Sequence, residues 1–156
     1  MIFKHIIRKA ALLLALQASV AFAQDYKVGD LRINQPWSRS TAPGAQVGGG
    51  YLSIKNVGKV ADRLIEVKTP AAKMVEMHNS VVENGVMRMR EMENIEIKPG
   101  QTVVLKPNGL HLMLMMLEKP LTQGTRFPVI LTFEKAGKVE VMMQVEKAGH
   151  SAVHKH

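Results

Sequence analysis

The chain has 156 residues, with twenty-one Lys and Arg against thirteen Asp and Glu, eleven methionines and no cysteine. The absence of cysteine excludes disulfides, thiolate metal ligands, C-x-x-C-H haem attachment and a blue-copper site of the His₂Cys type. Only seven residues are aromatic, and no cluster of Lys and Arg is interleaved with them, which argues against nucleic-acid binding.

Residues 1–23 have the pattern of an export signal. The segment starts with positive charge at Lys4, Arg8 and Lys9. A short apolar run follows from Ala10 to Val20, and Ala21-Phe22-Ala23 fits the small-x-small cleavage site. The apolar run is shorter than the roughly 20 residues that a membrane-spanning helix needs. We therefore expect an exported mature protein that begins at Gln24 and does not span a membrane; a retained N-terminal anchor is the alternative. Removing the three basic residues leaves a mild net charge of +5.

Residues 24–148 are expected to form a single all-β domain. Short runs of β-forming residues alternate with turn sequences rich in Gly, Asn and Pro, about one strand per dozen residues, which is typical of a β-sandwich or small barrel. The predicted strands are Tyr26–Ile33, Gly50–Lys55, Arg63–Val67, Lys73–His78, Val86–Arg90, Thr102–Leu105, His111–Leu117, Val129–Phe133 and Val139–Val145. In the last two strands, alternate apolar residues are expected to face the core.

The Lys73–His78 strand ends on a histidine, and the turn at Glu83-Asn84-Gly85 leads into Val86–Arg90 as its hairpin partner. On that partner, Met87 and Met89 share one face and the two arginines share the other, because successive side chains on a strand point to opposite faces. We expect the arginines to face solvent. The hairpin would then place His78 and the two methionines within reach of a neighbouring strand.

The predicted strand His111–Leu117 contains a His-x-Met pair. His111 and Met113 lie two residues apart, so they share a face at roughly 6.5–7 Å and both side chains can reach one ion. Leu112, Leu114 and Met116 alternate with them and are expected to face the core. A methionine in a β-strand is usually a packing residue. Imidazole and thioether together, however, suit Cu(I).

Four of these residues, His78, Met89, His111 and Met113, follow the spacing His-x10-Met-x21-His-x-Met. This spacing resembles the motif of the exported copper chaperones of the PCuAC family. The resemblance extends to other segments of the chain: Pro36-Trp37-Ser38-Arg39, Tyr51 to Gly58, Asp62-Arg63-Leu64, Gly85 to Arg90, and Gly109 to Met115.

The resemblance implies a cupredoxin-like Greek-key β-sandwich that binds one Cu(I) ion per chain through those four side chains. It also implies a role as a carrier that delivers copper to an acceptor protein, either a cytochrome c oxidase subunit at its CuA centre or an oxidase assembly factor. We expect a monomer. The extra methionines Met77, Met87 and Met115 either assist ligand exchange or simply pack, with packing the more common role.

The last eight residues, 149–156, form a predicted flexible tail that holds three of the six histidines, His150, His154 and His156. Such a tail either binds Cu(II) or zinc weakly or has no role. The sequence offers no paired carboxylates and no G-x-S-x-G motif, so we do not expect an enzyme. Two other functions remain open beside the carrier: a copper-buffering or resistance protein without a dedicated acceptor, and a metal-free interaction module.

Overall fold

A computed structural model describes residues 25–150, and these residues form strands and loops without a helix. The strands are β1 (Tyr26–Val28), β2 (Leu31–Arg39), β3 (Val47–Asn56), β4 (Asp62–Lys68), β5 (Ala72–Glu83), β6 (Val86–Met92), β7 (Ile95–Ile97), β8 (Thr102–Leu105), β9 (Leu110–Leu117), β10 (Arg126–Phe133) and β11 (Gly137–Glu146). The predicted signal segment and His154 and His156 of the predicted tail lie outside the described residues. Among the described residues, no helix is long and apolar enough to cross a membrane.

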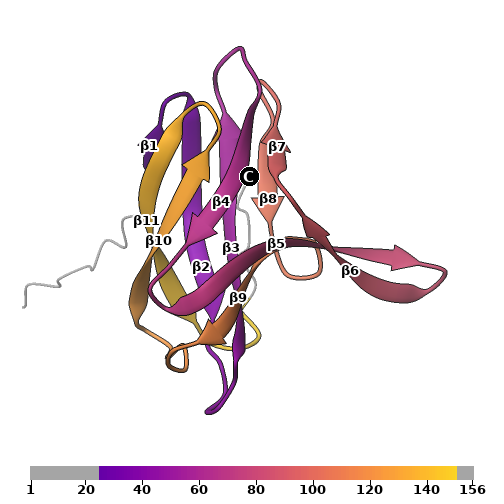
Figure 1. The fold of residues 1–156 in the computed structure, drawn as a ribbon, viewed down its shortest axis with the longest axis vertical. Coiled ribbons are helices and arrows are strands. Elements are labelled where there is room, and N and C mark those ends of the chain that lie inside the picture. Colours follow the sequence, from indigo (N-terminus) through magenta and orange to yellow (C-terminus); the bar gives the residue numbers. More distant parts are fainter. Residues whose placement is uncertain (1–24, 151–156) are drawn as a thin grey trace, which may run out of the picture.

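The strands pair along one hydrogen-bonded path in the order β6-β5-β9-β3-β2-β11-β10-β4-β7, with β1 added to β2 and β8 added to β3. The β2–β11 pair is parallel, and its neighbours in the path are antiparallel. The paired strands pack around a shared hydrophobic core, whereas the β5–β6 hairpin projects away from the body of the molecule (Figure 1). The predicted all-β sandwich is therefore confirmed.

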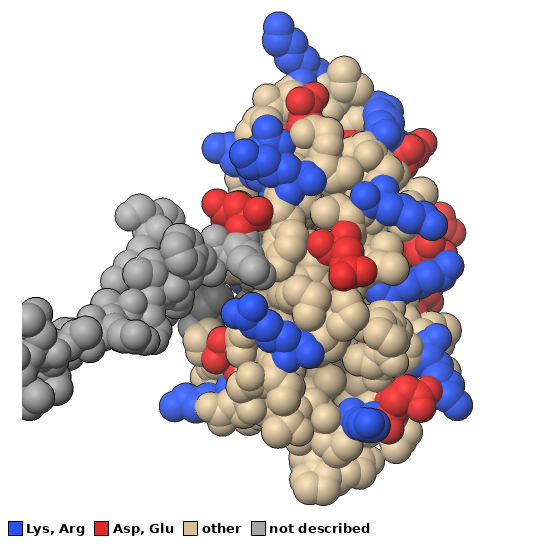
Figure 2. Space-filling model, turned by 90° about the vertical axis from the view of Figure 1, so that its left-hand side faces the viewer, with Lys and Arg blue, Asp and Glu red and all other residues tan. Residues whose placement is uncertain are grey.

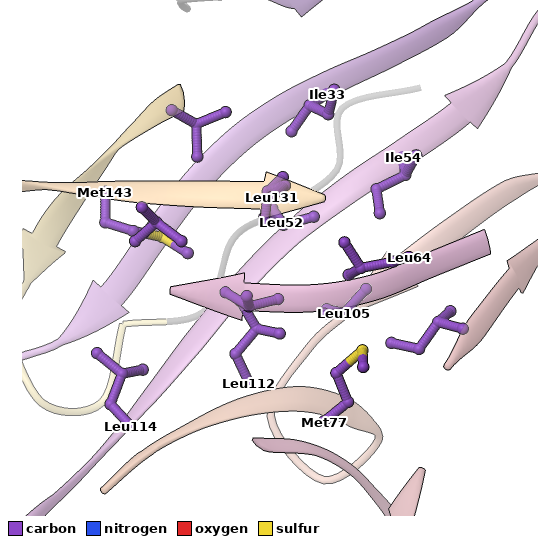
Figure 3. Packing of buried hydrophobic residues seen from close by; sticks show 14 of the residues in the cluster. Ile33, Leu52, Ile54, Leu64, Met77, Leu105, Leu112, Leu114, Leu131 and Met143 are labelled. Carbon is purple, nitrogen blue, oxygen red and sulfur yellow. The ribbon is translucent and has the colours of Figure 1, made fainter. Parts of the chain in front are cut away.

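The core is formed by alternate residues from the inner faces of these strands. Figure 3 shows Ile33, Ile54, Leu112 and Leu131 converging from four different strands, and each is fully buried. Burying an aliphatic side chain of this size stabilises the fold by roughly 1.5–3 kcal/mol. The alternation predicted for the last two strands is confirmed, because the residues expected in the core are buried or packed against it: Val129, Leu131, Phe133, Val139, Val141, Met143 and Val145.

The predicted strand Tyr26–Ile33 is wrong as a single element. Gly29 has a φ of 52°, and the chain turns there so that β1 folds back onto β2. The β2 strand then continues to Arg39 through Pro36, although proline is more common in turns than within strands. The register with β3 shifts at this point and Gln35 has a φ of 50°, so a bulge accommodates the proline.

Met116 does not face the core as predicted. Its φ is 54° and its side chain is 45% exposed, while the neighbouring Leu117 is buried. The positive φ breaks the strict alternation at the end of β9, so Met116 points outward and Leu117 points inward. The short strand β7 was not predicted, since three residues are too few to show a periodic pattern.

Charged side chains are mixed on the face of the molecule shown in Figure 2. Lys and Arg are spread over this face, and Asp and Glu lie among them. One buried carboxylate has a structural role: Asp62 accepts hydrogen bonds from the backbone amides of Arg63, Lys135 and Ala136, at 2.8 to 2.9 Å. It thereby holds the turn between β10 and β11 against the start of β4.

Candidate metal site

Two of the predicted ligands lie opposite each other on neighbouring strands. The antiparallel pairing of β5 with β9 places His78 directly across from His111, with ring centroids 5.8 Å apart and an interplanar angle of 66°. The same ladder pairs Met77 with Leu112 on the inner face, where both are buried. A slip of one residue would turn Leu112 out to solvent, so burial of the inner face fixes the register that brings the histidines together.

Met113 stands on the same outer face as the two histidines. It lies two residues from His111 on β9, opposite Glu76 on β5 and opposite Gly49 on β3. A side chain at Gly49 would collide with the Tyr51 hydroxyl group, so the Tyr51 ring lies over this glycine and bounds the Met113 side of the face.

Met89 is the outlying member of the predicted set. In the β5–β6 hairpin it pairs with Ser80, which places it on the outer face as a diagonal neighbour of His78, and its side chain is 56% exposed. Strand β5 lies between it and His111. The structure therefore brings two histidines together, sets Met113 beside them, and leaves Met89 on the projecting hairpin at the edge of the same face (Figure 1).

The hydrogen bonds of the two imidazoles decide which nitrogen is available to a metal. In His111, which is buried, Nδ1–H donates to the backbone oxygen of Gly109 at 2.8 Å. A carbonyl oxygen only accepts, so Nδ1 carries the proton and Nε2 has a free lone pair. In His78, Nε2 lies 2.7 Å from a carboxylate oxygen of Glu76, and Nδ1 is buried without a hydrogen-bond partner. A buried imidazole nitrogen without a partner fits a metal ligand.

The hairpin separates soft and charged groups between its two faces. On the face opposite His78, Glu83 forms ion pairs with Arg88, at 3.6 Å, and with Arg90. On the face that carries His78, exposed Met87 and Met89 lie beside each other. The predicted division between methionines and arginines is confirmed, and the arginine charges point away from the candidate ligands.

Glu76 was not predicted as a site residue, and Trp37 was not predicted to lie near the site. Glu76 precedes His78 by two residues, so the strand period alone places it on the same face.

Trp37 packs against Tyr51 with ring centroids 4.5 Å apart. Burial raises the pKa of the Tyr51 hydroxyl, and the Arg39 charge partly offsets this rise.

His150, the first histidine of the predicted tail, packs edge-on against Trp37, with ring centroids 4.9 Å apart. Its backbone oxygen accepts a hydrogen bond from Arg39 at 3.2 Å. It therefore lies on the Trp37 side of the molecule and is not paired with His78 or His111. Across residues 25–150, no group of three or more His, Asp and Glu side chains is arranged to hold a metal ion, and the candidate site combines imidazoles with thioethers.

Comparison with known families gives a match over residues 31–145 to a family described as "Putative lipoprotein LpqE-like". The matched segment contains β2 to β10 and nearly all of β11, and it includes all four predicted ligands. The chain belongs to the LpqE-like family. A curated protein similar to this chain is "Putative lipoprotein Lxx21020" of Leifsonia xyli subsp. xyli, which is 28% identical over 117 residues, or 74% of this chain and 69% of the relative.

Solved structures similar to this LpqE-like protein include PCuAC domains. The copper-bound PCuAC domain from PmoF2 is 29% identical, with a TM-score of 0.70 over 80% of this chain and 99% of that domain. The solution structure of Cu(I)-DR1885 from Deinococcus radiodurans shares the fold at 22% identity, with a TM-score of 0.57 over 83% of this chain and 85% of that one. The expected cupredoxin-like fold is thereby confirmed, and the resemblance to PCuAC domains is supported at the level of structure.

Proposed function

We propose that this LpqE-like protein binds one Cu(I) ion through His78, Met89, His111 and Met113 and carries it to an acceptor protein in the periplasm. The observation that carries this proposal is the pairing of His78 with His111. In each ring, one nitrogen contacts a neighbouring oxygen and the other nitrogen has no hydrogen-bond partner. Met113 lies beside the two rings on the same face. The copper-bound PCuAC domain from PmoF2 supports the choice of metal.

The donor set suits the reduced ion. Imidazole nitrogen and thioether sulfur are neutral, Cu(I) favours soft ligands, and a cationic site without thiolate disfavours the higher oxidation state. Neutral thioethers also hold copper less strongly than thiolates, so transfer to an acceptor with cysteine ligands is downhill. Met89 at the edge of the site is more than half exposed, so an acceptor protein can reach it.

The proposed acceptor is a cytochrome c oxidase subunit at its CuA centre or an oxidase assembly factor, as the resemblance to the PCuAC family implies. The periplasmic location is supported by the signal pattern of residues 1–23 and by the description of the family as lipoprotein-like. Weak Cu(II) binding by the histidine tail is an accessory part of the proposal.

One observation separates this proposal from a metal-free module, whereas copper buffering is separated from it only by an experiment. A metal-free module would give no reason for two imidazoles to face each other, and here they do so with a buried, unpartnered nitrogen. A copper-buffering protein would use the same site, so only transfer distinguishes it from a carrier.

The proposal is tested by an anaerobic Cu(I) titration of the mature protein against a colorimetric Cu(I) chelator. A variant with both His111→Ala and Met113→Ala is titrated beside it, and a Met87→Leu variant serves as the matched control. We expect one tightly bound equivalent in the native and control proteins and its loss in the double variant. Failure of the native protein to compete with the chelator would remove both copper functions.

Delivery is tested separately from binding. The Cu(I)-loaded protein is mixed with a copper-free CuA domain, the two are separated, and the copper in each is measured. A carrier transfers most of its copper to the acceptor, whereas a buffering protein retains it.

A further inference from the structure

We infer that Glu76 is a positioning residue for the copper site: its carboxylate fixes the tautomer of His78 so that Nδ1 is the nitrogen offered to the ion. This inference rests on the proposed function, because it assigns a role in that same site. Neither the spacing of the four predicted ligands nor the match to the family points to Glu76.

The contact between Glu76 and His78 determines where the proton of the neutral ring sits. The carboxylate oxygen lies 2.7 Å from Nε2, and an ionised carboxylate only accepts hydrogen bonds. Nε2 therefore carries the proton, and Nδ1 keeps its lone pair. Both side chains are largely shielded from water, with 15% of His78 and 23% of Glu76 exposed, so the bond competes little with solvent.

The two histidines thereby present different nitrogens. In His111 the backbone oxygen of Gly109 holds the proton on Nδ1 and leaves Nε2 free. In His78 the carboxylate holds the proton on Nε2 and leaves Nδ1 free. An oxygen partner for the second ring nitrogen is the usual way in which proteins orient a metal-binding histidine.

The carboxylate also supplies the charge that the four ligands lack. Cu(I) bound by two imidazoles and two thioethers leaves a net charge of +1. Glu76 lies opposite Met113 and touches His78, so its negative charge is beside the ion. Of the other charged residues on the hairpin, Glu91 lies opposite His78 but is exposed, while Arg88 and Arg90 are paired to Glu83 on the far face.

Three variants separate positioning from charge. Glu76→Ala removes both the acceptor and the charge. Glu76→Gln keeps an oxygen acceptor for Nε2–H and removes only the charge. Glu91→Gln is the matched control, because it removes a carboxylate that flanks His78 from β6 without a contact to its ring.

The first readout is the tautomer of His78 in the copper-free protein, measured by long-range ¹H–¹⁵N NMR in mildly alkaline buffer. We expect the Nε2–H tautomer in the native protein, in Glu76→Gln and in Glu91→Gln, and a substantial Nδ1–H population in Glu76→Ala. A native His78 in the Nδ1–H form, or a tautomer that is unchanged in Glu76→Ala, would overturn the inference. This readout needs no copper, so it remains informative even if the proposed function fails.

The second readout is Cu(I) affinity by chelator competition. We expect Glu76→Ala to bind roughly 10- to 100-fold more weakly than the native protein, which is the usual cost of losing such a partner of a metal ligand. Glu76→Gln falls between them, and Glu91→Gln stays near the native value. If the native protein binds Cu(I) and Glu76→Ala binds it equally tightly, the inference about Glu76 is wrong but the proposed function stands. If the native protein does not bind Cu(I), the proposed function is wrong.

Discussion

The two faces of strands β5 and β9 are built from alternating residues of the same segments, yet they have opposite characters. The inner face carries Met77, Leu112 and Leu114, which are 7%, 0% and 1% exposed. The outer face carries the paired histidines and Met113. Burial of the inner face fixes the strand register, and the outer face depends on that register to bring its ligands together. The site is therefore stabilised mainly by residues that would never touch the metal.

The largest effect is expected from Leu112→Ala on the inner face. Truncating a fully buried leucine costs about 2–5 kcal/mol of unfolding free energy through lost burial and the cavity that remains. Chemical denaturation followed by tryptophan fluorescence measures this loss. The fraction that remains folded should still bind one Cu(I) equivalent. A variant that is fully stable but unable to bind copper would contradict the division of roles between the two faces.

On the outer face, Met113→Leu and Met89→Leu should weaken Cu(I) binding with little effect on folding. Leucine has a similar volume and no thioether, and such exchanges usually cost less than about 1.5 kcal/mol of stability. We expect each variant to bind Cu(I) about tenfold or more weakly than the native protein, measured by anaerobic chelator competition.

Met87→Leu is the control for this pair, because Met87 is as exposed as Met89 but lies two residue pairs nearer the hairpin tip. Its affinity should match that of the native protein. If Met87→Leu and Met89→Leu lose equal Cu(I) affinity, the two methionines of the hairpin act interchangeably and Met89 is not a specific ligand.

Methionine oxidation should sharpen the contrast between exposed and buried thioethers. Met87 and Met89 are more than half exposed, whereas Met143 is fully buried and Met77 nearly so. Under mild peroxide treatment, peptide mass spectrometry should find sulfoxide at the exposed pair several-fold faster than at the buried pair. Equal oxidation rates at the exposed and the buried methionines would contradict this contrast.

The sequence predicted most of the fold, because the period-two pattern and the Gly and Asn turns mark each long strand. It did not predict the outward turn of Met116, since the positive φ that causes it has no signature at a methionine. For the site, the spacing and the resemblance named four residues. The opposition of His78 and His111, however, depends on strand pairing between segments more than thirty residues apart. Glu76 was missed because its role exists only once the orientation of the His78 ring is known.

The smallest effect is expected on the far face of the hairpin, where Glu83 pairs with Arg88 and Arg90. These side chains are 40% to 63% exposed, and exposed ion pairs contribute about 0–1 kcal/mol each. Glu83→Gln should therefore lower the unfolding free energy by no more than about 1 kcal/mol, and high salt should reduce the difference further. Cu(I) affinity should not change, because the arginines point away from His78. A large loss of affinity in this variant would mean that the ion pairs hold the hairpin in the position that Met89 needs, and that the two faces of the hairpin act together.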